Sequence, residues 1–130
     1  MTISMITAGV LGLMLLFLSV YVIAGRVKLK IDLGDGGSAE MQRRIRVHAN
    51  FVEYVPMALI LIMLVEYGKV GPSGLPAALA VALVVGRALH AYGLAGSSGA
   101  SVGRFVGTNL TALTILAGAL ATLGRGFGLC

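Results

Sequence analysis

Cysteine, tryptophan and charged residues are all scarce or absent in this sequence of 130 residues. Its single cysteine, Cys130, has no partner within the sequence, which excludes a disulfide framework and a thiolate metal site. The two histidines, His48 and His90, lie far apart and lack the carboxylates and the spacing of a metal-binding motif. We therefore expect no metal site.

Acidic residues are also few: five Asp and Glu stand against ten Lys and Arg, for a formal charge of +5. Six of the ten basic residues lie between residues 26 and 46. A nucleic-acid interface would spread basic residues over a solvated face with aromatic partners, whereas the four Tyr and four Phe of this chain are scattered. We expect no nucleic acid among the partners.

Apolar residues dominate the chain. Hydrophobic residues make up 58% and charged residues 12% of it, and its mean hydropathy is +0.96, whereas a soluble domain is about half apolar and a quarter charged. At about 20 apolar residues per crossing, this composition predicts an all-α membrane protein, a four-transmembrane-helix bundle in one domain over residues 1–130. The helices are expected at about residues 3–29, 39–67, 75–94 and 103–123, the second of them capped by Ser38.

The basic residues also predict how the helices are oriented. Seven Lys and Arg fall on the side of the connection between the first two helices, against Lys69 and Arg125 on the other side. Because basic residues favour the cytoplasm, both termini are expected outside it. A cleaved secretory signal is disfavoured, since the chain starts without a basic segment and the uncharged run of residues 3–25 is too long.

A polar stripe marks the first half of the second predicted helix. Arg43, Arg46, Asn50 and Glu53 follow one another at i, i+3, i+7 and i+10, so they share one helix face. One interpretation is a solvated helix extension in which Arg46 pairs with Asn50 and Glu53. The other is a ligand site, because a carboxylate near membrane depth must face the bundle interior and find a partner. A third interpretation is a structural Arg–Glu pair between helices.

The third and fourth predicted helices carry polar residues as well. Arg87 and His90 lie one turn apart, and Arg104 opens the last helix with Thr108 and Thr111 after it. For His90 alone an internal hydrogen bond is the simpler interpretation, and for the two threonines bonding back to their own helix. Together, the guanidinium groups would clamp carboxylates and Glu53 would receive an ammonium, a combination that suits a small zwitterionic or anionic, peptide-like ligand.

Residues 43–56, RRIRVHANFVEYVP, resemble the second-helix pattern of the MAPEG family, the membrane-associated proteins of eicosanoid and glutathione metabolism. GRVKLK at residues 25–30, VGRALH at residues 85–90 and the Gly- and Ser-rich segment before Arg104 agree with it. The resemblance covers essentially the whole chain, and LGDGG at residues 33–37 looks like the bacterial branch.

This resemblance implies a homotrimer of four-helix protomers in a bacterial inner membrane, with glutathione as co-substrate between neighbouring subunits near the cytoplasmic face. Arg104 matches the arginine held near the thiol and is the expected catalytic residue. The expected glutathione-binding residues are those that match the family's contact positions, with two further candidates beside them: Lys28, Arg46, Asn50, Glu53 and His90, and additionally Arg43 and Arg87.

The implied function is a glutathione-dependent transferase or peroxidase that acts on hydrophobic electrophiles arriving through the membrane lipid. Three positions depart from the pattern: Ala49 stands where some active relatives have Arg, Leu94 where a Tyr contact is expected, and Phe105 where a hydroxyl is expected. These departures favour a non-catalytic MAPEG-like protein that binds a thiol or small anion. A small channel or transporter is a further alternative, which the lack of interrupted helices weakens.

Overall fold

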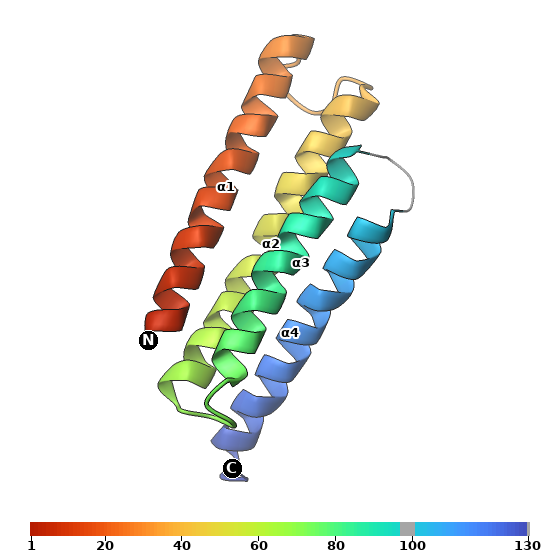
Figure 1. The fold of residues 1–130 in the computed structure, drawn as a ribbon. Helices are drawn as coiled ribbons and strands as arrows, with labels where there is room; N and C mark the ends of the chain where they lie inside the picture. Colours follow the sequence, from red (N-terminus) through yellow and green to blue (C-terminus); the bar gives the residue numbers. More distant parts are fainter. Residues whose placement is uncertain (97–100, 130) are drawn as a thin grey trace.

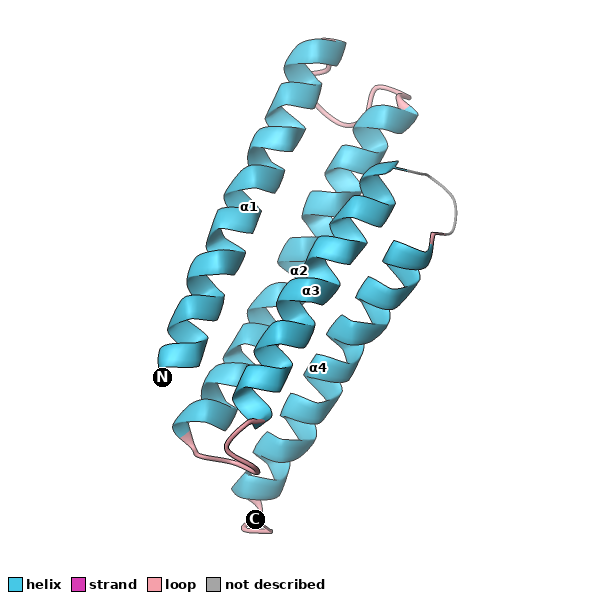
Figure 2. Ribbon diagram, in the orientation of Figure 1, coloured by secondary structure: helices cyan, strands magenta, loops and turns pink. Residues whose placement is uncertain are grey.

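The computed structural model of the chain describes residues 1–96 and 101–129, and these form four α-helices and no strand (Figures 1 and 2). The helices are α1 (Thr2–Leu29), α2 (Ala39–Tyr67), α3 (Leu75–Gly96) and α4 (Val102–Gly126). Each is long and apolar enough to cross a membrane. The predicted all-α, four-helix membrane fold is therefore confirmed, while Cys130 lies outside the described residues.

The helices run antiparallel in sequence order, so the start of α1 and the end of α4 lie at the same end of the bundle (Figure 1). The basic α1–α2 connection lies at the opposite end, with the end of α3 and the start of α4. Ser38 caps α2 as expected, because its hydroxyl accepts a hydrogen bond from the Met41 amide at 3.2 Å. In the same way Ser101 caps α4 by accepting from the Arg104 amide at 3.3 Å.

The third helix extends two residues beyond its expected end, and the fourth continues to Gly126 instead of residue 123. The difference at the end of α3 has a packing reason. Gly93, near the expected end of the helix, is buried against the first turn of α4, where a Cβ atom would lie 2.7 Å from the Arg104 amide nitrogen. A glycine that is unfavourable for a helix in isolation is here held in the helix by its neighbour.

Glycines line the contact between α3 and α4, which is the most extensive contact between two helices in the described chain. Gly86 and Gly93 of α3 face Gly103 and Gly107 of α4. A Cβ atom on Gly107 would lie 2.6 Å from the His90 amide nitrogen and would also collide with the Gly86 carbonyl oxygen. Lipid tails are as apolar as leucine, so membrane helices associate largely through such close backbone packing. The contact sets the position of His90 relative to α4.

Helix α1 is attached to α2 by polar contacts near both of its ends. At the start of α1, the Glu66 carboxylate accepts hydrogen bonds from the Ile3 and Ser4 amides at 3.0 and 2.8 Å, which satisfies donors that have no partner within the helix. Near the other end, the Arg44 guanidinium stacks 4.1 Å from the centre of the Tyr21 ring and donates to the Tyr21 carbonyl oxygen at 2.7 Å.

The buried core is centred on α2, which packs against the other three helices. Its buried residues recur every three or four positions and form one continuous apolar face: Val47, Phe51, Val55, Ala58, Ile62 and Val65. Helix α2 continues through Pro56. The polar residues of its first half therefore sit on a helix held from three sides.

We predict that Gly107→Ala destabilises the bundle, because the added methyl group overpacks the α3–α4 contact at a cost of about 1–3 kcal/mol. Gly12→Ala in α1 is the matched control. Nothing lies within 4 Å of a Cβ atom there, so the usual gain in helix propensity should keep or slightly raise the melting temperature. Thermal unfolding in mild detergent measures both, and equal melting temperatures would contradict the packing role of Gly107.

Candidate functional site

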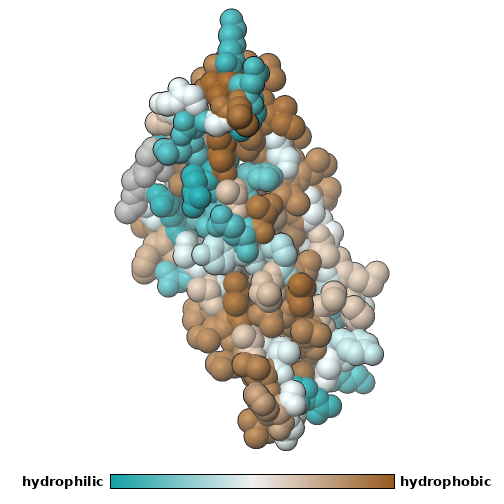
Figure 3. Space-filling model, turned by 180° about the vertical axis from the view of Figure 1, so that it is seen from behind, coloured by the Kyte–Doolittle hydropathy of each residue, from teal (hydrophilic) through white to brown (hydrophobic). Residues whose placement is uncertain are grey.

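A polar pocket of about 220 Å³ lies among α2, α3 and α4 in the half of the bundle that carries the basic residues. Seen from behind, hydrophilic side chains gather in the upper half of the molecule and apolar ones cover most of the lower half (Figure 3). Helix α2 supplies four of the residues that line the pocket, α3 two and α4 one: Gln42, Arg43, Arg46, Asn50, His90, Leu94 and Arg104.

Three of the four residues of the stripe predicted on α2 form one wall of this pocket, and Glu53 does not. Arg43, Arg46 and Asn50 all line it, and Gln42, one turn before Arg46, joins them. Gln42 was not predicted from the sequence, although its spacing of four residues from Arg46 and eight from Asn50 places it on the same helix face. Three arginines, counting Arg104 opposite, make the pocket a site for negatively charged groups.

The opposite wall comes from the α3–α4 contact. His90 is 6% exposed and lines the pocket beside the glycine contact, so its ring has little freedom to move. Arg104 lies in the first turn of α4, which Ser101 caps, and a hydrogen bond joins Ser101 to the Gly93 carbonyl oxygen at 3.1 Å. The position of Arg104 therefore depends on both helices.

Arg87 lies behind the pocket and does not line it. This side chain is 2% exposed and donates to the Asn50 side-chain oxygen at 2.7 Å and, at 3.5 Å, to the carbonyl oxygens of Asn50 and Gly107. It thus joins α3 to α2 and α4 and contacts one of the lining residues. A ligand in the pocket would meet Asn50, with Arg87 beneath it.

Two of the expected glutathione-binding residues do not line the pocket in a single protomer. The Lys28 ammonium pairs with the Glu40 carboxylate at 3.1 Å, near the end of α1. Glu53 is exposed at the midpoint of α2, one turn beyond Asn50. Within the described residues no ion pair joins Glu53 to Arg46, since Glu40 and Glu66 are the carboxylates in the ion pairs there. The described pocket lining contains no carboxylate.

The three departures from the family pattern occupy different environments. Leu94 is buried and lines the pocket, so the absence of a hydroxyl there changes its wall directly. Phe105 is largely exposed on the outer face of α4, and Ala49 is half-buried outside the pocket lining. Within the described residues, no group of three or more His, Cys, Asp or Glu side chains could hold a metal ion.

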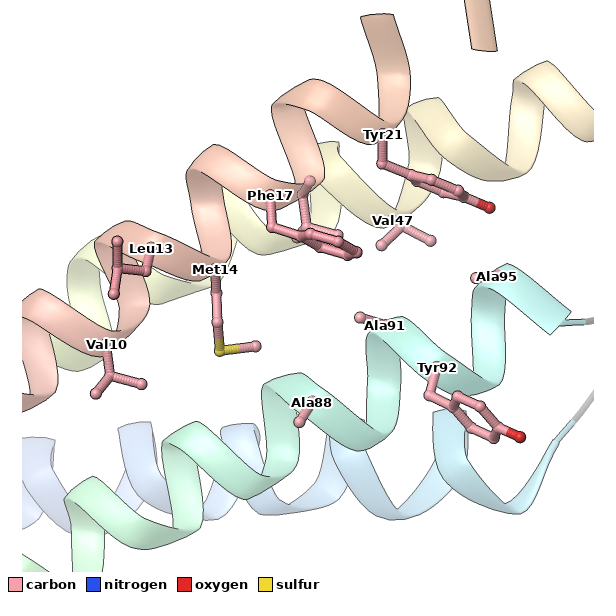
Figure 4. A pocket seen from close by; sticks show the side chains of 11 residues that line it. Val10, Leu13, Met14, Phe17, Tyr21, Val47, Ala88, Ala91, Tyr92 and Ala95 are labelled. Carbon is pink, nitrogen blue, oxygen red and sulfur yellow. The ribbon is translucent and has the colours of Figure 1, made fainter. Parts of the chain in front are cut away.

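An apolar groove of about 610 Å³ runs between α1 and α3 (Figure 4). Residues of α1 line one side, three alanines and Tyr92 of α3 line the other, and Val47 of α2 lies between them. The full lining is Val10, Leu13, Met14, Phe17, Leu18, Tyr21, Val47, Ala88, Ala91, Tyr92 and Ala95. This groove within the protomer was not predicted from the sequence.

The groove and the polar pocket lie on the two sides of the α2–α3 contact, the groove with α1 and the pocket with α4. Val47 in the groove follows Arg46 in the pocket, and Ala91 in the groove follows His90 in the pocket. Consecutive helical residues point about 100° apart, so the two cavities are separated only by the width of the α2–α3 contact. The arrangement sets a site for anions next to a site for apolar groups.

Comparison with known proteins gives two results. The sequence model of the MAPEG family matches residues 4–124. The chain is also similar to the protein named "Inner membrane protein YecN" from Escherichia coli strain K12 and from strain O6:H1 (CFT073 / ATCC 700928 / UPEC). In each case 33% of residues are identical over 91 residues, which cover 70% of this chain and 69% of the relative.

The three arginines predict that the pocket binds a polyanionic peptide, for which glutathione sulfonate is the probe, and that Arg46→Gln weakens this binding by about tenfold, the effect of losing one charge-assisted hydrogen bond. Lys69→Gln is the matched control, because Lys69 is exposed in the turn after α2, at the other end of the helix. Isothermal titration calorimetry in detergent measures both affinities. An equal loss in the two variants would indicate a general charge effect and contradict the pocket.

Proposed function

This chain belongs to the MAPEG family, and from that premise we propose that it is a glutathione-dependent transferase or peroxidase acting on hydrophobic electrophiles in the membrane. The observation that carries the proposal is the polar pocket, where Arg46, Asn50, His90 and Arg104 meet in one protomer. Three of these match glutathione contacts of the family, and Arg104 matches the arginine near the thiol.

The binding half of the proposal rests on charge. Glutathione carries carboxylates, and guanidinium groups bind carboxylates through paired hydrogen bonds. Arg43 and Arg46 project from successive turns of α2 into the pocket, so they suit the carboxylates of one extended peptide. Asn50 and His90 supply polar contacts between those turns and α3.

The chemical half requires a thiolate. A free cysteine thiol has a pKa of about 8.5, and an adjacent cation lowers it, so the reactive form becomes available at neutral pH. Arg104 is the residue proposed for this role. In a transferase reaction the thiolate sulfur forms a bond to the electrophilic carbon, while the displaced electron pair leaves with the departing group or takes a proton from solvent.

The apolar co-substrate would reach the site through the lipid. The groove between α1 and α3 is lined by aliphatic and aromatic side chains and lies beside the polar pocket (Figure 4). Holding the electrophile there would concentrate it near the thiol binding site, on the other side of the α2–α3 contact.

The proposed assembly is a homotrimer, as the family resemblance implies. The exposure of Glu53 supports contact with a second protomer. Its carboxylate is exposed at the midpoint of α2, although residues 55–65 after it are uncharged and the helix is long enough to span a membrane. A charge facing lipid at that depth costs several kcal/mol. A neighbouring protomer would shield Glu53 and bring Lys28 and Glu53 within reach of a shared ligand.

A non-catalytic thiol- or anion-binding protein is the second candidate, and one observation favours it. Leu94 lines the pocket where a tyrosine contact is expected, so one hydrogen bond to the ligand is missing. A channel or transporter receives no such support, because all four helices of the described chain run without interruption.

We further propose that the protein lies in a bacterial inner membrane with both termini outside the cytoplasm. The relative named an inner membrane protein supports the location, and the basic residues around the α1–α2 connection support the orientation. A reporter that is active only outside the cytoplasm, fused after residue 130, should be active. A reporter fused within the α1–α2 connection should report the cytoplasm, and the reverse pattern would contradict the orientation.

We predict that Arg104→Gln leaves glutathione affinity within a few-fold of the parent protein but returns the thiol pKa toward its free value near 8.5, so the thiolate fraction at pH 7 falls to a few per cent. Calorimetry measures the affinity, and ultraviolet thiolate absorbance measures the ionisation. Arg125→Gln, at the other end of α4, is the matched control and should keep the parent signal.

The same samples separate the alternatives. A parent protein that binds glutathione without thiolate absorbance at neutral pH would replace the enzyme proposal by the binding-only one. Full thiolate signal in Arg104→Gln would remove the activating role from Arg104. A monomeric mass in mild detergent with undiminished glutathione binding would contradict the shared site.

A further inference from the structure

Asn50 has two chemically different ends, and the structure determines which of them faces the polar pocket. A carboxamide has an oxygen that only accepts hydrogen bonds and an NH₂ group that only donates them. A guanidinium has donors only. The Arg87 guanidinium lies 2.7 Å from the Asn50 side chain, so the carboxamide oxygen must point toward Arg87.

The reverse orientation would be costly because Arg87 is buried. The side chain is 2% exposed, and the other hydrogen bonds of its guanidinium are long ones to backbone carbonyl oxygens. Within the described residues it has no carboxylate partner, and its Nε atom is buried without an acceptor. Turning the NH₂ group toward Arg87 would set donor against donor and leave a buried charge with still fewer acceptors.

The NH₂ group is consequently the part of the Asn50 carboxamide that remains for the pocket, which Asn50 lines. Arg43, Arg46 and Arg104 line it as well, and all three carry donors only. The pocket therefore presents hydrogen-bond donors from α2 and α4. At Asn50 it presents a donor because of Arg87, which does not line the pocket.

We propose that Arg87 is a positioning residue that makes Asn50 a hydrogen-bond donor, so that this part of the pocket accepts a carboxylate or another oxyanion and rejects an ammonium group. The inference rests on the proposed function for its ligand: it assigns a carboxylate of glutathione to Asn50. The glutathione ammonium must then bind elsewhere, and Glu53, one turn further along α2, is the nearest carboxylate on that face.

The decisive variant is Asn50→Asp, which keeps the shape of the side chain and its acceptor toward Arg87 but removes the NH₂ donors. The buried guanidinium gains a carboxylate partner, so the melting temperature should stay equal or rise. Affinity for glutathione should fall by about tenfold or more, because a negative charge replaces a donor beside the bound carboxylate. The parent preference for glutathione over its diethyl ester, in which the carboxylates are masked, should shrink, while Arg43 and Arg46 keep part of it.

Two variants of Arg87 test the positioning role itself. Arg87→Met removes the donors and leaves the carboxamide able to turn, so the preference for glutathione over the diethyl ester should shrink. Arg87→Lys still donates to the Asn50 oxygen and should retain most of that preference. If Arg87 only joined the helices, both ligands would lose affinity by the same factor and lysine would restore nothing beyond stability.

Calorimetry with glutathione, its diethyl ester and inorganic sulfate separates this inference from the proposed function. A parent protein that binds sulfate but not glutathione would overturn the glutathione proposal, and loss of sulfate binding in Asn50→Asp would still support the donor role. Unchanged or tighter glutathione binding by Asn50→Asp would show that Asn50 accepts from the ligand and would overturn the inference. A parent that binds none of the three would overturn both.

Discussion

The close approach of α3 and α4 is the contact on which the rest of the molecule depends. Gly86 and Gly93 on one helix meet Gly103 and Gly107 on the other, with no room for a Cβ atom at Gly107. In lipid, apolar side chains gain little by leaving one apolar environment for another, so helices associate where their backbones can touch. This contact holds His90 beside the first turn of α4, and it exposes the Gly107 carbonyl oxygen to the buried Arg87.

A buried cation links this contact to α2. Arg87 extends from α3 to the Asn50 carboxamide and has no carboxylate partner in the described part of the chain. Removing such a charge from water is costly, so losing its hydrogen bonds to Asn50 and to the Gly107 carbonyl oxygen would be unfavourable. One of these acceptors belongs to a residue that lines the polar pocket. The same interaction that joins the helices thus fixes the orientation of a side chain that lines the pocket.

The two cavities differ in character, since polar and charged residues line one and apolar residues line the other. The polar pocket lies among α2, α3 and α4, where the helices are packed most closely, whereas the apolar groove lies beside α1, whose middle stands apart from α3. Polar contacts near both ends of α1, at Glu66 and at Arg44, hold the helix in place around that groove. Of the three departures from the family pattern, Leu94 alone changes the lining of the pocket. Ala49 and Phe105 are not among the residues that line it.

The sequence by itself determined the four helices, the Ser38 cap and the shared face of Arg43, Arg46 and Asn50, because these follow from hydrophobic length and from the periodicity within one helix. Only the tertiary structure decided which polar residues meet. The pairing of Lys28 with Glu40, the place of Arg87 behind Asn50 and the apolar groove were not predictable from spacing. Periodicity gives the angle of a residue around its own helix axis, whereas its contacts depend on how neighbouring helices are rotated and displaced against one another. Glycine contacts and the reach of long side chains set that rotation here, and neither can be read from a single helix.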